Sequence, residues 1–365
     1  MDKTKALYYI ENSFLTSLLC DEDVTDISYN GADIFYVSNS KGRIKSDIVI
    51  DQQTARDFLR QIANISEQQF SYTSPILDIS IDKYRINAAH QSIAKINNED
   101  VVTFSIRIAS MKPRIDSNSD FFTPLLVELI NLISNSHQSM VIGGITSSGK
   151  TEFQKYILRN FQNNERVIVI DNVLELDAIR QDSNIDLTCW KVDEKNPYTS
   201  SSLLIKNALR NNPDWLILAE ARDKEMVDVL NSAMTGIPLI TTIHAQDVYS
   251  LPYRMGRMIL RGDQKLDYNE TLNDIYYHFH FYFYLCKKTV NHEITRYISQ
   301  VGFIDNKGKY FDLYKRNGKE HFYFKLPEGA KSLLEISSVS NNFKKIFLEG
   351  NVWKSMLLFL SLFLF

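Results

Sequence analysis

The sequence predicts an α/β fold in which a large domain with a parallel sheet follows a smaller α+β domain. Three observations lead to this expectation. From about residue 140 onward, nearly continuous apolar runs alternate with stretches of helical character, which is typical of strands that helices cover on both faces. The residues before about 110 instead mix short strands with one amphipathic helix. The chain has 365 residues, 44% of them hydrophobic, which is enough for two packed cores.

Residues 1–111 are expected to form the smaller domain. Short strands are predicted at 25–29 and 34–37, with the turn signal Asn30-Gly31 between them. A helix fits 51–66, because helical spacing gathers apolar side chains on one face: Ala55, Phe58, Leu59, Ile62 and Ala63. Further strands are expected around 76–81, 84–88 and 101–108. The polar stretch 112–120 contains proline and breaks the periodicity, so it is the predicted linker.

Residues 121–330 are expected to form the larger domain. Its strands are predicted at 140–142, 167–170, 215–218 and 239–243, with a helix over 152–161. Near the end of this domain, 275–286 and 293–304 are predicted as two antiparallel strands. The aromatic run 276–284 could stack on bases. We favour a packed hairpin, because aromatic residues suit pleated surfaces.

Composition limits the class of protein. The net charge of -3 argues against a protein that coats nucleic acid, and we expect no direct nucleic-acid partner. The three cysteines, Cys20, Cys189 and Cys286, are too few and too scattered for a disulfide framework or a four-thiolate zinc site, which favours a reducing compartment. The N-terminal stretch 1–20 lacks the pattern of a secretory signal, so a cytoplasmic location is expected.

The tail 331–365 ends in an almost entirely apolar stretch, 356–365. This stretch is too short to span a hydrocarbon core, which needs about twenty residues. Three interpretations stay open: a buried or partner-covered helix, shallow membrane insertion helped by Trp353 and Lys354, and a disordered or aberrant end.

The segment from Gly144 to Thr151 reads GITSSGKT and matches the pattern G-x-x-x-x-G-K-[ST]. A predicted strand precedes it and a predicted helix follows, so backbone N–H groups and the helix dipole would surround one phosphate group. We therefore predict an ATP site with Mg²⁺, where Lys150 reaches the outer phosphates and the Thr151 hydroxyl binds the metal. The predicted nucleotide-binding residues are Gly144, Thr146, Ser147, Ser148, Gly149, Lys150 and Thr151.

Polar residues follow three of the predicted strands, at the rim where open α/β sheets bind ligands. Asp171 and Glu175 come after 167–170, and Glu175 could polarise the attacking water or be a solvated loop carboxylate. Glu220 follows 215–218 and could hold the magnesium ion through a water molecule. His244 follows 239–243, where it could sense the outer phosphate or have a structural role.

Together these segments resemble the secretion ATPase superfamily. After the phosphate loop, 171–176 looks like its Asp box, 212–222 like its Walker B segment and 241–245 like its His box, in matching order and spacing. The resemblance covers about 18–304 and implies a RecA-like P-loop NTPase domain after a PAS-like N-terminal domain. Two positions depart from the family pattern: Ala219 replaces a usual glycine, and Asp171-Asn172 replaces a common Glu-Asp pair.

The resemblance also implies roles for individual residues. Arg85 and Arg107 would approach the outer phosphate when the domains close, and Arg210 and Arg222 would belong to the network around Glu220. Thr151 and Glu220 form the expected metal site. The expected catalytic residues are Lys150, Glu175, Glu220, Arg222 and His244, together with Arg85 and Arg107.

The function that the resemblance implies is that of a Mg²⁺-dependent ATPase assembled as a homo-oligomeric ring, a hexamer in this superfamily. Such a ring would dock on inner-membrane components at the cytoplasmic side of a type IV secretion, conjugation or pilus apparatus, with peripheral membrane association. The short N-terminal domain and the sequence Thr-Thr-Ile-His-Ala look most like the conjugation and type IV secretion branch, or the tight-adherence pilus branch. The alternative is a nucleotide-binding scaffold or regulator with little hydrolysis. A nucleic-acid translocase would need a basic channel that the net charge does not indicate.

Overall fold

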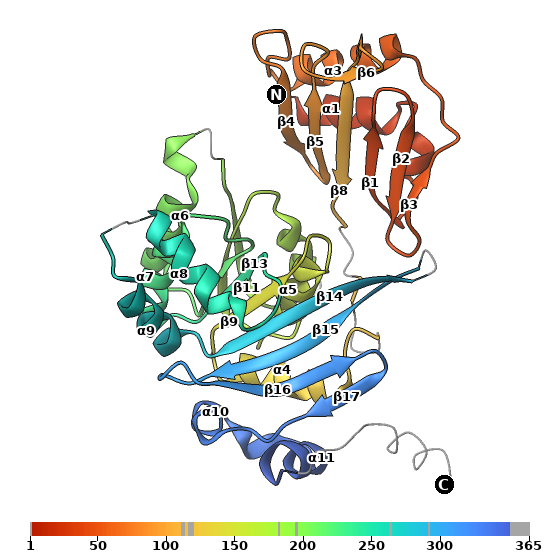
Figure 1. Ribbon diagram of the computed structural model, residues 1–365. Coiled ribbons are helices and arrows are strands. Elements are labelled where there is room, and N and C mark those ends of the chain that lie inside the picture. The colour runs from red at the N-terminus through yellow and green to blue at the C-terminus, as the bar shows by residue number, and fades with distance from the viewer. Residues whose placement is uncertain are drawn as a thin grey trace, which may run out of the picture. The chain divides into compact units, whose positions relative to one another are not determined.

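The chain divides into two compact units in the computed structural model, which describes residues 2–110, 114–115, 120–181, 183–193, 196–262, 265–290 and 293–350. Unit 1 comprises Met1–Lys112 and Lys288–Thr295, and unit 2 comprises Pro113–Lys287 and Arg296–Phe365. Each unit has its own sheet and its own buried core (Figure 1).

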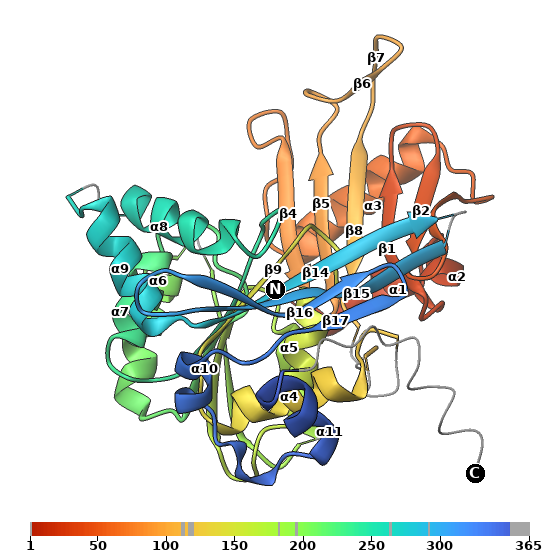
Figure 2. The ribbon, with the colours of Figure 1, turned by 60° about the horizontal axis from the view of Figure 1, so that its bottom comes forward.

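Unit 1 is built on an antiparallel six-stranded sheet with the order β3-β2-β1-β8-β5-β4. Helices α1 (Lys3–Glu11), α2 (Thr16–Leu19) and α3 (Gln52–Ile65) share one apolar core with the sheet, and Figure 2 shows the small hairpin of β6 (Lys95–Ile96) and β7 (Glu99–Asp100) extending beyond it. The sheet strands are β1 (Val24–Tyr29), β2 (Ile34–Ser38), β3 (Gly42–Lys45), β4 (Ile76–Ile81), β5 (Tyr84–Ala89) and β8 (Thr103–Ile108).

The α3 helix shows how the sequence of unit 1 specifies its structure. The Asp51 side chain accepts the N–H of Thr54 at 2.7 Å, which caps the first turn. All of the apolar residues predicted for one face are buried against the sheet: Ala55, Phe58, Leu59, Ile62 and Ala63. The predicted helix is therefore confirmed, and so are the predicted strands of this unit, each to within two residues at either end.

Unit 2 is built on a nine-stranded sheet with the order β11-β10-β12-β13-β9-β14-β15-β16-β17. The strands from β11 to β14 in this order are parallel, whereas β15, β16 and β17 add an antiparallel extension. The bounds are β9 (Met140–Gly144), β10 (Arg166–Asp171), β11 (Asp186–Lys191), β12 (Trp215–Leu218), β13 (Leu239–Ile243), β14 (Phe281–Val290), β15 (Glu293–Ile304), β16 (Tyr310–Asn317) and β17 (Glu320–Tyr323).

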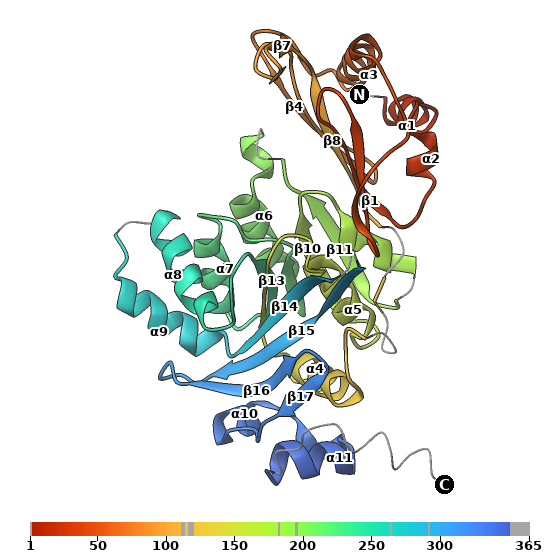
Figure 3. The ribbon, with the colours of Figure 1, turned by 45° about the vertical axis from the view of Figure 1, so that its right-hand side comes forward.

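Helices cover both faces of this sheet, as Figure 3 shows. One face packs against α4 (Pro124–Asn135) and α5 (Lys150–Arg159). The other packs against α6 (Ser201–Ala208), α7 (Met226–Ala233), α8 (Ser250–Gly262) and α9 (Tyr268–His278). In β10, Val169 points into the first core and Ile168 into the second, which explains why the strand is an unbroken apolar run. The predicted α/β fold class is confirmed.

The described residues after 330, up to 350, pack into the core of unit 2. The short helix α10 (Glu328–Leu333) buries Ala330 there, and α11 (Asn341–Phe343) with the π-helical turn 344–348 buries Phe343, Ile346 and Phe347. The division at residue 330 that the sequence suggested does not match this packing. The apolar stretch 356–365 lies outside the described residues, as does most of the predicted linker. Among the helices that are described, none has the length and apolar character needed to cross a bilayer.

One predicted strand is wrong in part. Residues 275–278 were expected to begin a strand, but they complete helix α9, and β14 starts only at Phe281. The α9 helix is capped by Asp267, whose side chain accepts the N–H groups of Asn269 and Glu270. The aromatic run 276–284 is therefore divided between a helix end and a strand. The other predicted strands of unit 2 are confirmed to within two residues at either end.

Candidate functional site

The phosphate loop connects β9, inside the sheet, to the first turn of α5. Gly149 has a φ of +96° and Ser147 a φ of +60°, which turn the backbone sharply into the helix. At Gly144 a Cβ would lie 2.8 Å from the carbonyl oxygen of Leu285, so only glycine fits between the loop and β14. The buried hydroxyl of Ser148 has no hydrogen-bond partner within the described chain. A helix start with these features fits a phosphate group.

Lys150 is folded over this loop. Its side chain is 9% exposed, and its Nζ lies 3.1 Å from the carbonyl oxygens of both Gly144 and Ile145. The same Nζ lies 3.2 Å from Nδ1 of His244. Thr151 follows as the second residue of α5 and is partly exposed, and Thr146 lies in the exposed part of the loop. The lysine ammonium is thus held at the helix start, where it can move to a bound phosphate.

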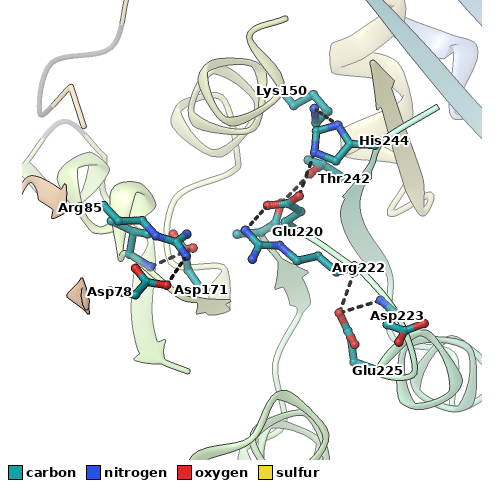
Figure 4. Close-up of polar contacts among 12 residues, drawn as sticks. Asp78, Arg85, Lys150, Asp171, Glu220, Arg222, Asp223, Glu225, Thr242 and His244 are labelled. Atoms are coloured by element: carbon teal, nitrogen blue, oxygen red, sulfur yellow. Dashed lines mark hydrogen bonds and ion pairs between the residues drawn. The ribbon is translucent and has the colours of Figure 1, made fainter. Parts of the chain in front are cut away.

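Glu220 lies at the centre of a row of charged side chains (Figure 4). Its Oε1 is 3.1 Å from Nε2 of His244, and its Oε2 is 2.8 Å from Nη2 of Arg222. His244 in turn contacts Lys150. The residues come from the ends of β12 and β13 and from the start of α5, which the sheet order brings together.

The surroundings shift the pKa values of two nearby carboxyl groups in opposite directions. Burial alone would raise the pKa of Glu220, but the hydrogen bond and charge of Arg222, with the charges of His244 and Lys150, lower it below its usual value. Burial raises the pKa of Asp171, and this outweighs the backbone N–H groups that it accepts. Glu220 is therefore the ionised carboxylate that suits a metal ion.

Two residues that the sequence analysis missed hold the Glu220 loop. The Thr242 hydroxyl donates to the carbonyl of Ala219 at 2.8 Å, and Glu225 Oε1 accepts the backbone N–H of Arg222 at 2.6 Å. A signal for Thr242 exists in the sequence, because a hydroxyl inside an apolar strand needs a local acceptor. Glu225 had a weaker signal, as the last residue before helix α7.

Asp171 holds the turn that leads to Glu175. Its Oδ2 accepts the N–H of Glu175 at 3.0 Å and its Oδ1 that of Val173 at 3.3 Å. Leu174, between them, has a φ of +59°, an uncommon value for a leucine. Glu175 then begins the 3₁₀ turn Glu175–Gln181. Asp171 thus fixes the backbone at Glu175, whose action on water stays a prediction.

The predicted arginines fall into three groups. Arg222 is paired with Glu220, as expected. Arg210 is exposed and lies on the turn Leu209–Asn211, which precedes the first residue of β12, whereas Glu220 follows the last. It therefore lies at the opposite edge of the sheet, and its expected place in the Glu220 network is wrong.

Arg85 and Arg107 belong to unit 1. They are direct partners in the β5–β8 register, on the face opposite the buried pair Ile86 and Ile106. Arg85 Nη2 lies 3.4 Å from Oδ2 of Asp78 on β4. Both arginines thus share the face of the sheet that turns away from the helices, and their approach to a phosphate stays a prediction.

Comparisons with known proteins find relatives of this chain in both sequence and structure. An uncharacterized protein of Bacillus anthracis is 27% identical over 332 residues, which are 84% of this chain and 73% of that protein. The type IV secretion system protein VirB11 of Bartonella quintana is 31% identical over 130 residues, about a third of either chain. Among solved structures, the ATPase DotB of Legionella pneumophila matches with a TM-score of 0.60 and 18% identity, covering 80% of this chain and 79% of that one.

The family comparison covers most of the chain. The family model described as type II/IV secretion system protein matches residues 98–358, which include the phosphate loop, Glu175, Glu220 and His244. The chain therefore belongs to the type II/IV secretion system protein family, whose members are secretion ATPases.

Proposed function

We propose that the chain is the ATP-hydrolysing subunit of a ring motor that drives a type IV secretion, conjugation or type IV pilus-like apparatus. The observation that supports this most directly is the row Lys150, His244, Glu220 and Arg222 beside the phosphate loop. This row connects a lysine ammonium, which can bind phosphates, to an ionised carboxylate, which can hold a metal ion. ATP hydrolysis requires both.

The residues of unit 2 divide the chemistry among them. The loop N–H groups and Lys150 would bind the phosphates, while the Thr151 hydroxyl and Glu220 would hold Mg²⁺. When bound there, the metal ion would supply positive charge against the phosphate oxygens. Glu175 orients the attacking water, and His244 links Lys150 to Glu220, so that a movement of the lysine ammonium reaches the carboxylate.

The assembly that we propose is a homo-oligomer, a hexamer by family analogy, docked on inner-membrane components at the cytoplasmic face of the membrane. In this assembly Arg85 and Arg107 bring positive charge to the outer phosphate when the nucleotide site closes. Family membership and the type IV secretion name of one relative support this part of the proposal.

The test is phosphate release with ATP and Mg²⁺ by purified protein, alongside binding of a fluorescent ADP analogue. We expect Lys150→Ala to weaken nucleotide binding at least about ten-fold, and Glu220→Gln to retain binding while turnover falls about 100-fold. Removing Mg²⁺ with EDTA should stop turnover. Lys206→Ala is the control, because this lysine is 65% exposed and paired with Asp228. Wild-type turnover in Glu220→Gln would refute the assignment.

A second candidate is a nucleotide-binding scaffold or regulator that hydrolyses little ATP. Oε2 of Glu220 is paired with the Arg222 guanidinium and Oε1 with Nε2 of His244, and Lys150 is bound to carbonyl groups of its own loop. These contacts must rearrange before hydrolysis. Wild-type protein that binds ATP tightly but releases phosphate no faster than Glu220→Gln, even with membrane components added, would favour the scaffold over the motor.

A further inference from the structure

An arginine outside the phosphate loop, Asp box, Walker B segment and His box holds the phosphate loop. Arg296 lies on β15, in the antiparallel part of the sheet, and its Nε donates to the backbone carbonyl of Ser147 at 2.8 Å. Ser147 is the loop residue with a φ of +60°. A non-glycine residue in this region costs free energy, so its conformation persists only where the surroundings fix it.

The peptide group between Ser147 and Ser148 is fixed at both ends. Arg296 binds its carbonyl, and the N–H of Ser148 donates to the carbonyl of Ile145 at 3.2 Å. These two bonds set the plane of the Ser147–Ser148 peptide, which precedes the N-cap residue Gly149 and the first residue of α5, Lys150. The direction of the following N–H groups depends on this plane.

Arg296 also covers the side of the loop. A Cβ at Gly149 would lie 3.8 Å from Cδ of Arg296 and 3.3 Å from the ring of Phe121. The stem of the arginine and the ring therefore pack against the glycine at the helix start. The Arg296 side chain thus contacts two neighbouring parts of the loop, the Ser147 carbonyl and Gly149.

We propose that Arg296 is a positioning residue for nucleotide binding, on the basis of the proposed function. It orients the phosphate loop through the Ser147 carbonyl and does not itself bind the nucleotide. Removing the bond lets the Ser147–Ser148 peptide rotate, so the loop must be ordered again each time a phosphate binds. The effect is therefore on nucleotide affinity and not on the chemical step.

Two substitutions separate this bond from a general effect of positive charge. Arg296→Ala removes the bond and the charge, whereas Arg296→Lys keeps the charge but lacks the planar guanidinium with its Nε–H. Arg316→Ala is the matched control on neighbouring β16. The Arg316 Nη1 donates to the carbonyl of Asp120 at 2.7 Å, and its guanidinium lies 4.3 Å from the Tyr297 ring centre.

We expect both Arg296 variants to bind a fluorescent ADP analogue about ten-fold more weakly than wild type, which corresponds to about 1.4 kcal/mol. KM for ATP should rise by a similar factor while kcat stays within about two-fold. Hydrogen exchange of the nucleotide-free protein should become faster in 144–151 for both variants. Arg316→Ala should match wild type in all three measurements, and thermal unfolding midpoints should show that each variant is folded.

Several results would overturn the proposal: wild-type affinity in Arg296→Lys, unchanged exchange of the loop in Arg296→Ala, or a fall in kcat with KM unchanged. The proposed function fails in a different way. Wild-type protein that binds no nucleotide would contradict the ATP site itself, whereas loop exchange in the absence of nucleotide still reports whether Arg296 holds this segment.

Discussion

The two carboxyl groups nearest the site differ because their surroundings differ. Asp171 is held by backbone N–H groups in a buried turn, and burial is the larger effect on its pKa. Glu220 faces Arg222, His244 and Lys150, so cations control its ionisation. Asp171 and Glu175 are the two acids of the 171–175 turn. In the structure, the Asp171 carboxylate holds that turn by accepting backbone N–H groups.

The raised pKa of Asp171 predicts a pH dependence of stability with a definite sign. The ordinary pKa is 3.8, and the folded value is higher, so between the two the folded state binds more protons than the unfolded state. The stabilisation is present below pH 3.8 and is lost as pH rises through the folded pKa. The unfolding free energy of wild type minus that of Asp171→Asn should therefore fall as pH rises from about 4 and then level off.

Urea unfolding at a series of pH values, followed by tryptophan fluorescence, measures this difference, because Trp190 and Trp215 lie in unit 2. For Glu220→Gln, the pH dependence of the difference in unfolding free energy should have the opposite sign. The pKa of Glu220 is lowered, so its stabilisation is lost as pH falls below 4.5. A difference for Asp171→Asn that rises with pH would show that the backbone N–H groups, and not burial, control this carboxyl.

At the scale of the elements, the phosphate loop packs closely against β14. Gly144→Ala would place a Cβ 2.8 Å from the Leu285 carbonyl, which the sheet holds in place. We expect a loss of about 2 kcal/mol in the unfolding free energy of unit 2. At the preceding residue, Gly143→Ala would meet the end of the flexible Leu251 side chain, so its cost should stay below about 1 kcal/mol. Equal losses in urea unfolding would contradict this reading.

Also at the scale of the elements, the sequence predicts a helix or strand correctly where its apolar residues follow one clear pattern. The α3 helix has a clear apolar face and an Asp51 cap, and the buried strands of unit 2 are short apolar runs. The run 276–284 has no such periodicity, since aromatic residues occupy nearly every position, and the helix cap at Asp267 lies well before it. The hairpin of β16 and β17 was not anticipated, although Asn317-Gly318 marks its turn.

For the whole molecule, the spatial order of the strands decides which site residues meet. The chain order β9, β10, β12, β13 becomes β10-β12-β13-β9 in the sheet. His244, after β13, therefore lies between Glu220, after β12, and Lys150, after β9. The sequence predicts that these residues share one edge, because parallel strands end together. The sequence does not give the order of these residues along the edge, because that order depends on packing between distant segments. The contact of Arg296 with Ser147 depends on such packing too, so the sequence does not predict it either.

The division into two units predicts how the molecule unfolds. The three clusters of buried apolar residues follow the units: one lies in unit 1, and the two faces of the large sheet form the others. Ile106 is fully buried in the cluster of unit 1, and Ile240 is fully buried in one of the two clusters of unit 2. Truncating either to alanine should cost about 2–5 kcal/mol, but only in its own unit.

Calorimetry should therefore show two transitions, with Ile106→Ala lowering one midpoint by about 10 °C and Ile240→Ala lowering the other by several degrees. Tryptophan fluorescence identifies the second, because Trp190 and Trp215 both belong to unit 2. That optical transition should move in Ile240→Ala and remain in place in Ile106→Ala. If either substitution shifts both midpoints together, the two cores unfold as one cooperative structure, which would contradict the prediction.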